Sequence, residues 1–177
     1  TFLRNVVGSA DFTPTGVPIP GIPATAGFAL ADVVNIESGV QHFAQSVYTY
    51  EGSTALAFLN DVPVKWDDLY IVDGHPLKFN VTARRSGKDW YVGAATIDAR
   101  KIEIPLGEFI TDDGTYNAYI FGDNADGSAI EVKQLTGLTK DSVIEHDLMK
   151  NGGCAIKITK GSMKLTTPYS NYKFYEA

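Results

Sequence analysis

The 177-residue sequence has a single cysteine, Cys154, which excludes an internal disulfide and a metal site built from several cysteines. Basic residues are also scarce, with 15 Lys and Arg against 21 Asp and Glu and a formal net charge of −6. Binding to nucleic acid or to an anionic membrane surface needs a basic face, so neither partner is expected. The longest uncharged stretch, Phe12 to Ala31, contains four of the eight prolines and is not expected to span a membrane.

Charge is missing mainly from one part of the chain. Residues 1–63 have one basic residue, Arg4, and five acidic ones, whereas residues 64–177 have the other 14 basic and 16 acidic residues. A free-standing domain needs a charged surface to remain soluble. We therefore expect residues 1–63 to be part of a larger domain that covers them on most sides, and residues 64–177 to form a complete domain. The first residues do not resemble a signal peptide, and we expect Thr1 to lie within a longer protein.

Residues 1–63 show helical patterns joined by short strand-like pieces. The expected elements are a helix over 2–7, a strand over 9–13, a proline-rich loop over 13–23, a buried helix over 24–36, a strand over 40–44 and a helix over 53–60. Alternation of helices and strands is typical of an α/β fold. Two strands cannot close such a fold, so the pattern indicates a remnant of a barrel-like α/β domain.

After Pro63 the hydrophobic period changes from about 3.6 to 2, as in β-strands. The expected strands are 77–84, 90–97, 101–104, 115–121, 129–135, 143–148 and 154–159, separated by turn-forming clusters of Gly, Asp and Asn. Strands at this spacing without a long helical pattern predict an antiparallel β-sandwich. The tail from Leu165 to Ala177 is expected either to add an edge strand or to pack back on the preceding segment.

Three polar residues of the first segment are candidates for a site. Asp11 follows a presumed strand, where a barrel would direct it into the active-site mouth, although a turn hydrogen bond ahead of Pro14 is the favoured interpretation. Gln41 and His42 lie on the other presumed strand, so one of them points inward, but a buried structural histidine is the commoner situation. Glu37, near a helix end, is expected at the surface or in a helix cap.

The second segment offers weaker candidates. Asp123–Gly127 resembles a short calcium loop but lacks the later ligands, so a plain turn is favoured. The pair Arg84-Arg85 suggests an anion site, but solvated surface is the favoured interpretation. Trp66 and Trp90 could stack on a sugar, although both suit the core of a sandwich. The sequence shows no Ser/His/Asp set, phosphate loop or metal cluster.

A more specific signal comes from four longer motifs. The segments Phe58-Leu-Asn-Asp-Val-Pro-Val-Lys-Trp-Asp67 and Ala83-Arg-Arg-Ser-Gly-Lys-Asp-Trp-Tyr-Val-Gly93 resemble the C-terminal part of glycoside hydrolase family 97. Upstream, Phe2-Leu-Arg-Asn-Val-Val-Gly-Ser-Ala-Asp-Phe-Thr-Pro14 and Glu37-Ser-Gly-Val-Gln-His-Phe-Ala44 are similar to segments that lead through the last barrel strands of that family. The likeness runs in order up to about Lys160.

The resemblance implies a parent with an N-terminal β-sandwich, a central (β/α)8 barrel and a C-terminal β-sandwich. Residues 1–63 would be the last quarter of that barrel, with Asp11 at the end of its seventh strand and Gln41-His42 on its eighth, and residues 64–177 the C-terminal sandwich. Family 97 resembles α-glucosidases and α-galactosidases with an active-site calcium ion. The catalytic carboxylates and the calcium ligands would all precede this chain, and a periplasmic location is implied.

Our leading hypothesis is therefore a C-terminal fragment of a glycosidase that cleaves α-linked oligosaccharides. Its partners would be the remainder of the catalytic barrel and the oligosaccharide substrate of the parent, which Asp11, Gln41 and His42 would help to bind. The fragment alone is expected to have no catalytic residue and to be inactive. The alternative is a non-catalytic carbohydrate-binding or structural β-sandwich module, which exposed tryptophans would favour and buried ones would oppose.

Overall fold

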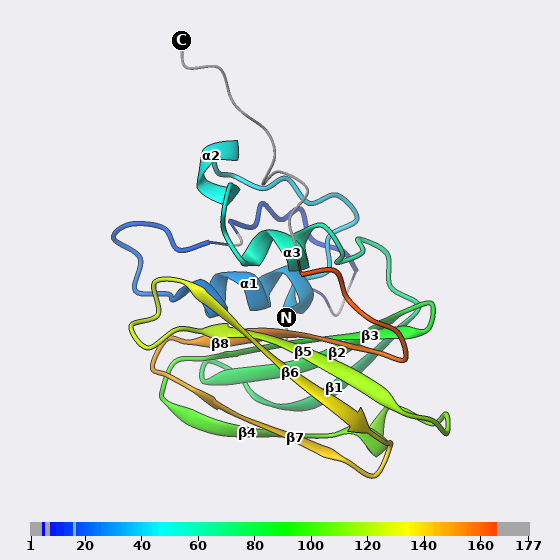
Figure 1. The fold of residues 1–177 in the computed structure, drawn as a ribbon. Coiled ribbons are helices and arrows are strands. Elements are labelled where there is room, and N and C mark those ends of the chain that lie inside the picture. Colours follow the sequence, from blue (N-terminus) through cyan, green and yellow to red (C-terminus); the bar gives the residue numbers. More distant parts are fainter. Residues whose placement is uncertain (1–4, 6–7, 16, 166–177) are drawn as a thin grey trace.

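A computed structural model describes residues 5, 8–15 and 17–165. Three short helices lie on one face of a large antiparallel sheet, and a two-stranded sheet covers the opposite face (Figure 1). The helices are α1 (Ala26–Asn35), α2 (Val47–Tyr50) and α3 (Ala55–Leu59). The strands are β1 (Asp68–His75), β2 (Phe79–Ser86), β3 (Asp89–Thr96), β4 (Arg100–Pro105), β5 (Tyr116–Asp123), β6 (Ile130–Leu138), β7 (Val143–Leu148) and β8 (Gly153–Thr159), with a short 3-10 helix, η2 (Leu106–Glu108), after β4.

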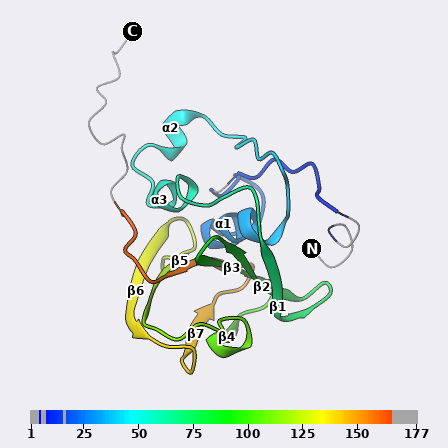
Figure 2. The same ribbon diagram turned by 90° about the vertical axis from the view of Figure 1, so that its right-hand side faces the viewer.

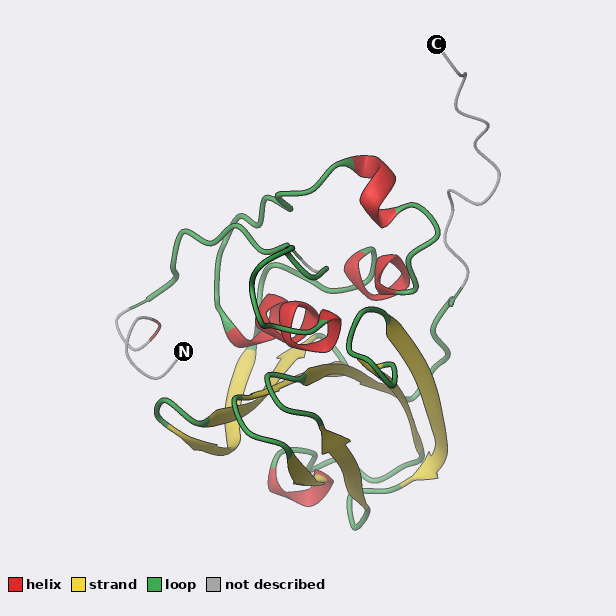
Figure 3. Cartoon of the chain, turned by 90° about the vertical axis from the view of Figure 1, so that its left-hand side faces the viewer, coloured by secondary structure: helices red, strands yellow, loops and turns green. Residues whose placement is uncertain are grey.

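The larger sheet has the order β1-β2-β3-β8-β5-β6, and every neighbouring pair is antiparallel. Strands β4 and β7 form the second sheet, also antiparallel. The larger sheet thus separates two layers, with the helices α1–α3 on one side and β4, β7 and η2 on the other (Figure 3). The prediction of a mainly β, antiparallel sandwich in the second segment is confirmed.

Each side of the larger sheet has its own apolar core. The core between the two sheets includes Val81, Val92, Ile104, Ile120, Ile144 and Ile156. The core between the sheet and the helices includes Ala26, Leu30, Val34, Phe58, Tyr91 and Phe121. The central strands β3 and β8 are consequently buried on both faces, which explains why their sequences are apolar almost throughout.

The prediction for β2 is incomplete, because the helical layer buries the face of this strand that was expected to lie in water. Alternation predicts one buried face, formed by Leu77, Phe79, Val81 and Ala83, and one polar face in water. In the structure Leu77 precedes the strand and is 92% exposed, which contradicts its predicted burial. The polar face of the strand is buried, with Thr82 and Arg84 at 0% and 1% exposure. The interpretation of Arg84 as solvated surface is therefore wrong, because the helical layer covers it and Glu37 of the same layer pairs with it.

Strand β1 and the two strands expected in the first segment also differ between prediction and structure. The pattern does not predict strand β1, because apolar residues lie on both of its faces: Leu69 and Ile71 are exposed, whereas Tyr70 and Val72 pack against the core. The strands expected over 9–13 and 40–44 shorten to one parallel bridge between Phe12 and Gln41. The helix expected over 2–7, except Asn5, and the tail beyond Leu165 lie outside the described residues.

Candidate functional site

The two strand-like segments of the first part lie side by side and run in the same direction. Besides the bridge between Phe12 and Gln41, the amide of Ala10 donates to the carbonyl of Glu37 at 2.7 Å and the amide of Ala44 donates to the carbonyl of Pro14 at 3.1 Å. Helix α1 connects these two segments in the chain. The order is an extended segment, a helix and a second extended segment in parallel contact with the first, which is similar to the strand–helix–strand unit of α/β barrels.

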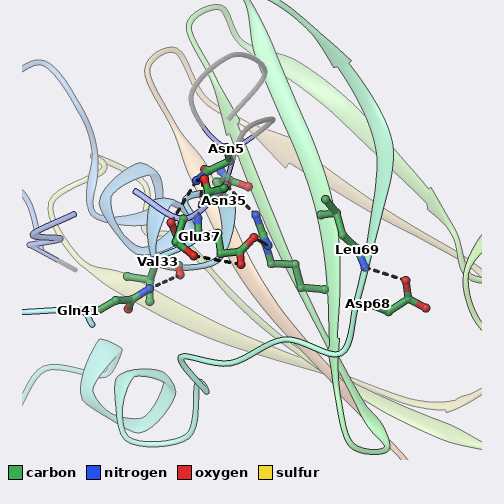
Figure 4. A network of polar contacts seen from close by, with 10 residues as sticks. Asn5, Val33, Asn35, Glu37, Gln41, Asp68 and Leu69 are labelled. Atoms are coloured by element: carbon green, nitrogen blue, oxygen red, sulfur yellow. Dashed lines mark hydrogen bonds and ion pairs between the residues drawn. The ribbon is translucent and has the colours of Figure 1, made fainter. Parts of the chain in front are cut away.

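The three predicted site residues flank this parallel contact. Asp11 and His42 are exposed, so their polar groups are accessible to a ligand. Gln41 is half-buried, and its side-chain Nε2 donates to the carbonyl of Val33 at 3.0 Å, which occupies its amide at the end of α1 (Figure 4). The structure therefore brings the segments of Asp11 and Gln41-His42 together, and their role in substrate binding stays a prediction.

A polar network at the C-terminal end of α1 joins the first segment to the sheet (Figure 4). The Asn5 side chain accepts from the amide of Glu37 at 3.2 Å and donates to its carbonyl at 3.1 Å. The Glu37 carboxylate then pairs with the Arg84 guanidinium of β2 at 3.2 Å, and that guanidinium also donates to the carbonyl of Asn35 at 3.4 Å. Burial lowers the pKa of Arg84 and the Glu37 charge opposes this shift, so the ion pair stabilises a cation inside the protein.

A second junction holds the N-terminal end of α1 to the sheet. The Asp123 carboxylate, at the end of β5, accepts from the amide of Gly27 at 2.6 Å, the hydroxyl of Thr25 at 2.7 Å and the amide of Gly153 at 3.1 Å. Thr25 in turn caps α1 by accepting from the amide of Phe28 at 3.1 Å. A carboxylate at a helix N-terminus is favoured by the helix dipole.

A third junction ties the end of α3 to the centre of the sheet. Lys157 of β8 is 8% exposed and lies 2.7 Å from the Asp61 carboxylate and 3.3 Å from that of Asp89. The Tyr91 hydroxyl donates to the same Asp61 carboxylate at 2.8 Å, and burial, aided by that carboxylate, raises the pKa of Tyr91. Together the three junctions hold the helical layer to the sheet at both ends of α1 and directly after α3.

Two cavities lie along the side of α1 that carries Phe28 and Asp32. A cavity of about 190 Å³ lies between Phe28, Asp32 and the end of the β1–β2 hairpin, and another of about 220 Å³ lies between the same two residues and the proline-rich loop. Burial raises the pKa of the Asp32 carboxyl to about 6, with an Asn35 hydrogen bond acting in the opposite direction. The sequence does not indicate Asp32 as a site residue, because a single acidic residue on an apolar helix forms no recognisable motif.

Asp32→Asn is expected to stabilise the chain at neutral pH. Because the folded-state pKa of Asp32 is raised, its ionisation costs nothing below pH 4 and destabilises the fold progressively as the pH rises to 6 and beyond. The gain should be about 1 to 2 kcal/mol at pH 7.5 and should disappear at pH 4. Urea unfolding at both pH values measures it. Equal gains at both pH values, or a loss at pH 7.5, would contradict the assignment.

The weaker candidates of the second segment are structural. Trp90 is 7% exposed in the core between the sheets, and Trp66 packs against Tyr91 with ring centroids 5.5 Å apart. Trp90 therefore fills the interior as the favoured interpretation has it, whereas Trp66 is partly buried and packs against the core of the helical layer. Cys154 is fully buried, and burial raises the pKa of its thiol, which makes it unreactive.

The loop that resembles a calcium site forms the β5–β6 turn, as favoured. Its Asp126 carboxylate accepts from the amide of Ser128 at 3.0 Å, and Asn124 accepts from the amide of Ala129 at 3.1 Å. The Asp123 carboxylate accepts hydrogen bonds from Thr25 and Gly27 at the N-terminal end of α1. Among the described residues, no group of three or more His, Cys, Asp or Glu side chains could hold a metal ion. Within the same residues, no helix has both the length and the apolar character needed to cross a bilayer.

Comparison with known proteins identifies the second segment. The sequence family described as "Glycosyl-hydrolase 97 C-terminal, oligomerisation" matches residues 65–159. A probable retaining α-galactosidase of Streptomyces bingchenggensis is 34% identical over 140 residues, which cover 77% of this chain and 22% of that protein. A retaining α-galactosidase of Bacteroides thetaiotaomicron is 30% identical over 174 residues, which cover 89% of this chain and 26% of that protein.

Solved structures of glycosidases are also similar to this chain. A β-arabinopyranosidase superposes with a TM-score of 0.73 at 25% identity, covering 87% of this chain and 26% of that one. A glycoside hydrolase family 97 enzyme from Pseudoalteromonas sp. strain K8, in complex with acarbose, superposes with a TM-score of 0.70 at 28% identity, covering 77% and 22%. The chain thus spans about a quarter of the length of the relatives that it matches.

Proposed function

Because the chain belongs to glycoside hydrolase family 97 through its C-terminal domain, we propose that it forms the last quarter of a glycosidase that releases α-linked sugars from oligosaccharides. In this proposal residues 1–63 are the end of a (β/α)8 catalytic barrel, and residues 64–177 are the sandwich that supports it. The observation that carries the proposal is the parallel contact between Phe12 and Gln41 on either side of α1, which is the pairing expected of adjacent barrel strands.

Two sugar specificities are supported by different relatives. The retaining α-galactosidases favour a terminal α-galactoside as the substrate, and we take this as the first candidate. Family 97 structures in complex with acarbose and panose favour an α-glucoside as the second. A separate carbohydrate-binding role of the sandwich is disfavoured, since Trp90 is buried and Trp66 is partly buried against the core of the helical layer.

The chemistry is assigned to the part of the parent outside this chain. The calcium ion implied by the family resemblance would be held by carboxylates upstream of this chain. Asp11, Gln41 and His42 would line the barrel mouth and contact substrate hydroxyl groups through hydrogen bonds.

The family description also includes oligomerisation, so we propose that the sandwich contributes to assembly of the parent. A periplasmic location is part of the proposal.

The proposal predicts a clear division of activity. The purified 177-residue chain should not hydrolyse nitrophenyl α-galactoside or α-glucoside, because the catalytic carboxylates are proposed to lie outside it. The longer protein that contains it should hydrolyse one of the two. Activity of the 177-residue chain would refute the assignment of chemistry to the upstream part, and an inactive but folded longer protein would refute the glycosidase itself.

A further inference from the structure

A pocket of about 350 Å³ lies where the sandwich meets two loops of the first segment. The proline-rich loop lines it through Val17, the α2–α3 connection through Ser53, and the β5–β6 turn through Ser128. Figure 2 shows strand β6 and the turn before it rising from the sheet to the level of α1 and α3. The volume is within the range of small-molecule sites, which is about 300 to 1,000 Å³.

Hydrogen bonds hold the walls of this pocket on both sides. In the first segment, the Tyr50 hydroxyl donates to the carbonyl of Thr15 at 2.5 Å, which ties α2 to the proline-rich loop. In the sandwich, the carbonyl of Gly127 accepts from the amide of Ala26 at 2.9 Å, which ties the β5–β6 turn to α1. A ligand that enters therefore meets a preformed site and does not have to order these loops.

One serine of the pocket can donate to a ligand and another can accept. Ser53 Oγ accepts from the amide of Ala55 at 3.3 Å, and no described residue accepts its hydroxyl hydrogen. Ser128 Oγ donates to the Asp126 carboxylate at 2.5 Å and accepts from Asn124 Nδ2 at 3.4 Å, which leaves one lone pair for a ligand. A ligand hydroxyl both donates and accepts, so it can bond to either serine.

The charge of the lining favours a neutral ligand. Among the described residues that line the pocket, Glu51 is the only titratable one, and it is exposed. A phosphate or carboxylate ligand would therefore meet no cation there. Apart from the hydroxyl groups, the lining is mostly apolar and includes the buried residues Val17, Ala55 and Ile130. A sugar ring has apolar C–H faces and a rim of hydroxyl groups, which match these two kinds of surface.

The pocket lies at the end of the first segment where the proposed barrel would bind its substrate. Its two loops follow the extended segments of Phe12 and Gln41, and loops after barrel strands surround the active-site mouth. Resting on the proposed function, we infer that this pocket binds one sugar unit of the oligosaccharide substrate and that the sandwich contributes Ser128 to the site. It differs from a separate carbohydrate-binding module, because the first segment and the sandwich form it together.

An NMR titration of the 177-residue chain tests the site, because the described lining lies entirely in this chain. The probes are panose and raffinose, and the readout is the shift of backbone amide signals. The amides of Ser53, Ser128 and Ala129 should shift saturably with at least one probe. The dissociation constant should be about 1 to 10 mM, since the described lining offers no aromatic ring for stacking.

Three variants locate the binding. Ser128→Trp should weaken it at least about tenfold, because the indole fills the pocket, and Ser53→Ala at least about threefold, because one donor is lost. Thr136→Trp, at an exposed position of β6, is the matched control and should bind as the unchanged chain does.

Two results would overturn the inference: no saturable shift with either probe up to about 50 mM, or binding that survives Ser128→Trp unchanged. Hydrolysis by the longer protein is a separate measurement. Binding by the 177-residue chain together with an inactive longer protein would refute the proposed function alone. An active longer protein whose 177-residue part binds neither probe would refute the inference alone.

Discussion

Gly27→Ala is expected to destabilise the chain by at least about 3 kcal/mol, although alanine favours a helix over glycine by about 1 kcal/mol. A Cβ at position 27 would collide with the backbone carbonyl of Gly153 and would approach the carboxyl carbon of Asp123 to 2.9 Å. Backbone atoms of a central strand cannot move aside as a side chain does. Helix α1 must therefore lift from the sheet, which breaks the 2.6 Å hydrogen bond from the Gly27 amide to Asp123.

Urea unfolding of Gly27→Ala and of Gly161→Ala checks this prediction. Gly161 is the matched control, because a Cβ there would come no closer than 3.6 Å to its nearest neighbour, the Thr159 hydroxyl. The control should change the free energy of unfolding by less than about 1 kcal/mol. If the two variants are equally stable, α1 does not lie against Gly153 as described.

Glu37→Gln is expected to cost about 2 kcal/mol, because it leaves the buried Arg84 cation without its counter-charge, while the 39% exposure of Glu37 keeps the loss below that of a fully buried pair. Arg84 is 1% exposed, and a guanidinium cannot escape by losing its proton. The double variant Glu37→Gln with Arg84→Met should recover much of the loss, since it removes the buried charge altogether. This recovery distinguishes an unpaired charge from general damage to the α1 junction.

The matched control for Glu37→Gln is Glu145→Gln. Glu145 pairs with Lys101 at 2.6 Å, but both side chains are about half exposed, at 54% and 49%. Such a surface pair contributes little to stability, because water screens both charges. Urea unfolding of all three variants gives the comparison, and a loss for Glu37→Gln no larger than for Glu145→Gln would show that burial of Arg84 does not govern the pair.

The sequence allows the sandwich to be predicted well, because most of its strands alternate between core and water or are bounded by clear turns. The prediction fails where a second layer changes what is buried. Arg84 sits on the polar side of an alternating strand, and only the position of Glu37 in the helical layer explains its burial. Strand β1 is missed for a different reason, since the apolar residues Leu69 and Ile71 lie on its exposed face and remove the contrast between its two faces.

The candidate site is harder to predict for the same reason. Asp11, Gln41 and His42 can be selected from strand-end positions, and the parallel contact brings their segments together. Asp32 and Asp123 cannot, because the significance of each depends on residues far away in sequence. Asp123 acquires its role from Thr25 and Gly27, almost a hundred residues earlier. Local patterns contain no information on such distant contacts.

The most direct test of the account is residue-resolved hydrogen exchange of the 177-residue chain, comparing amides of α1 with those of β3 and β8. If the sandwich and the end of the barrel form one cooperative body, Leu30, Ala31 and Val34 should open with free energies within about 1 kcal/mol of the central strands. Rapid exchange of α1 beside fully protected strands would contradict the account, since the helical layer would then be an appendage that the sandwich does not support.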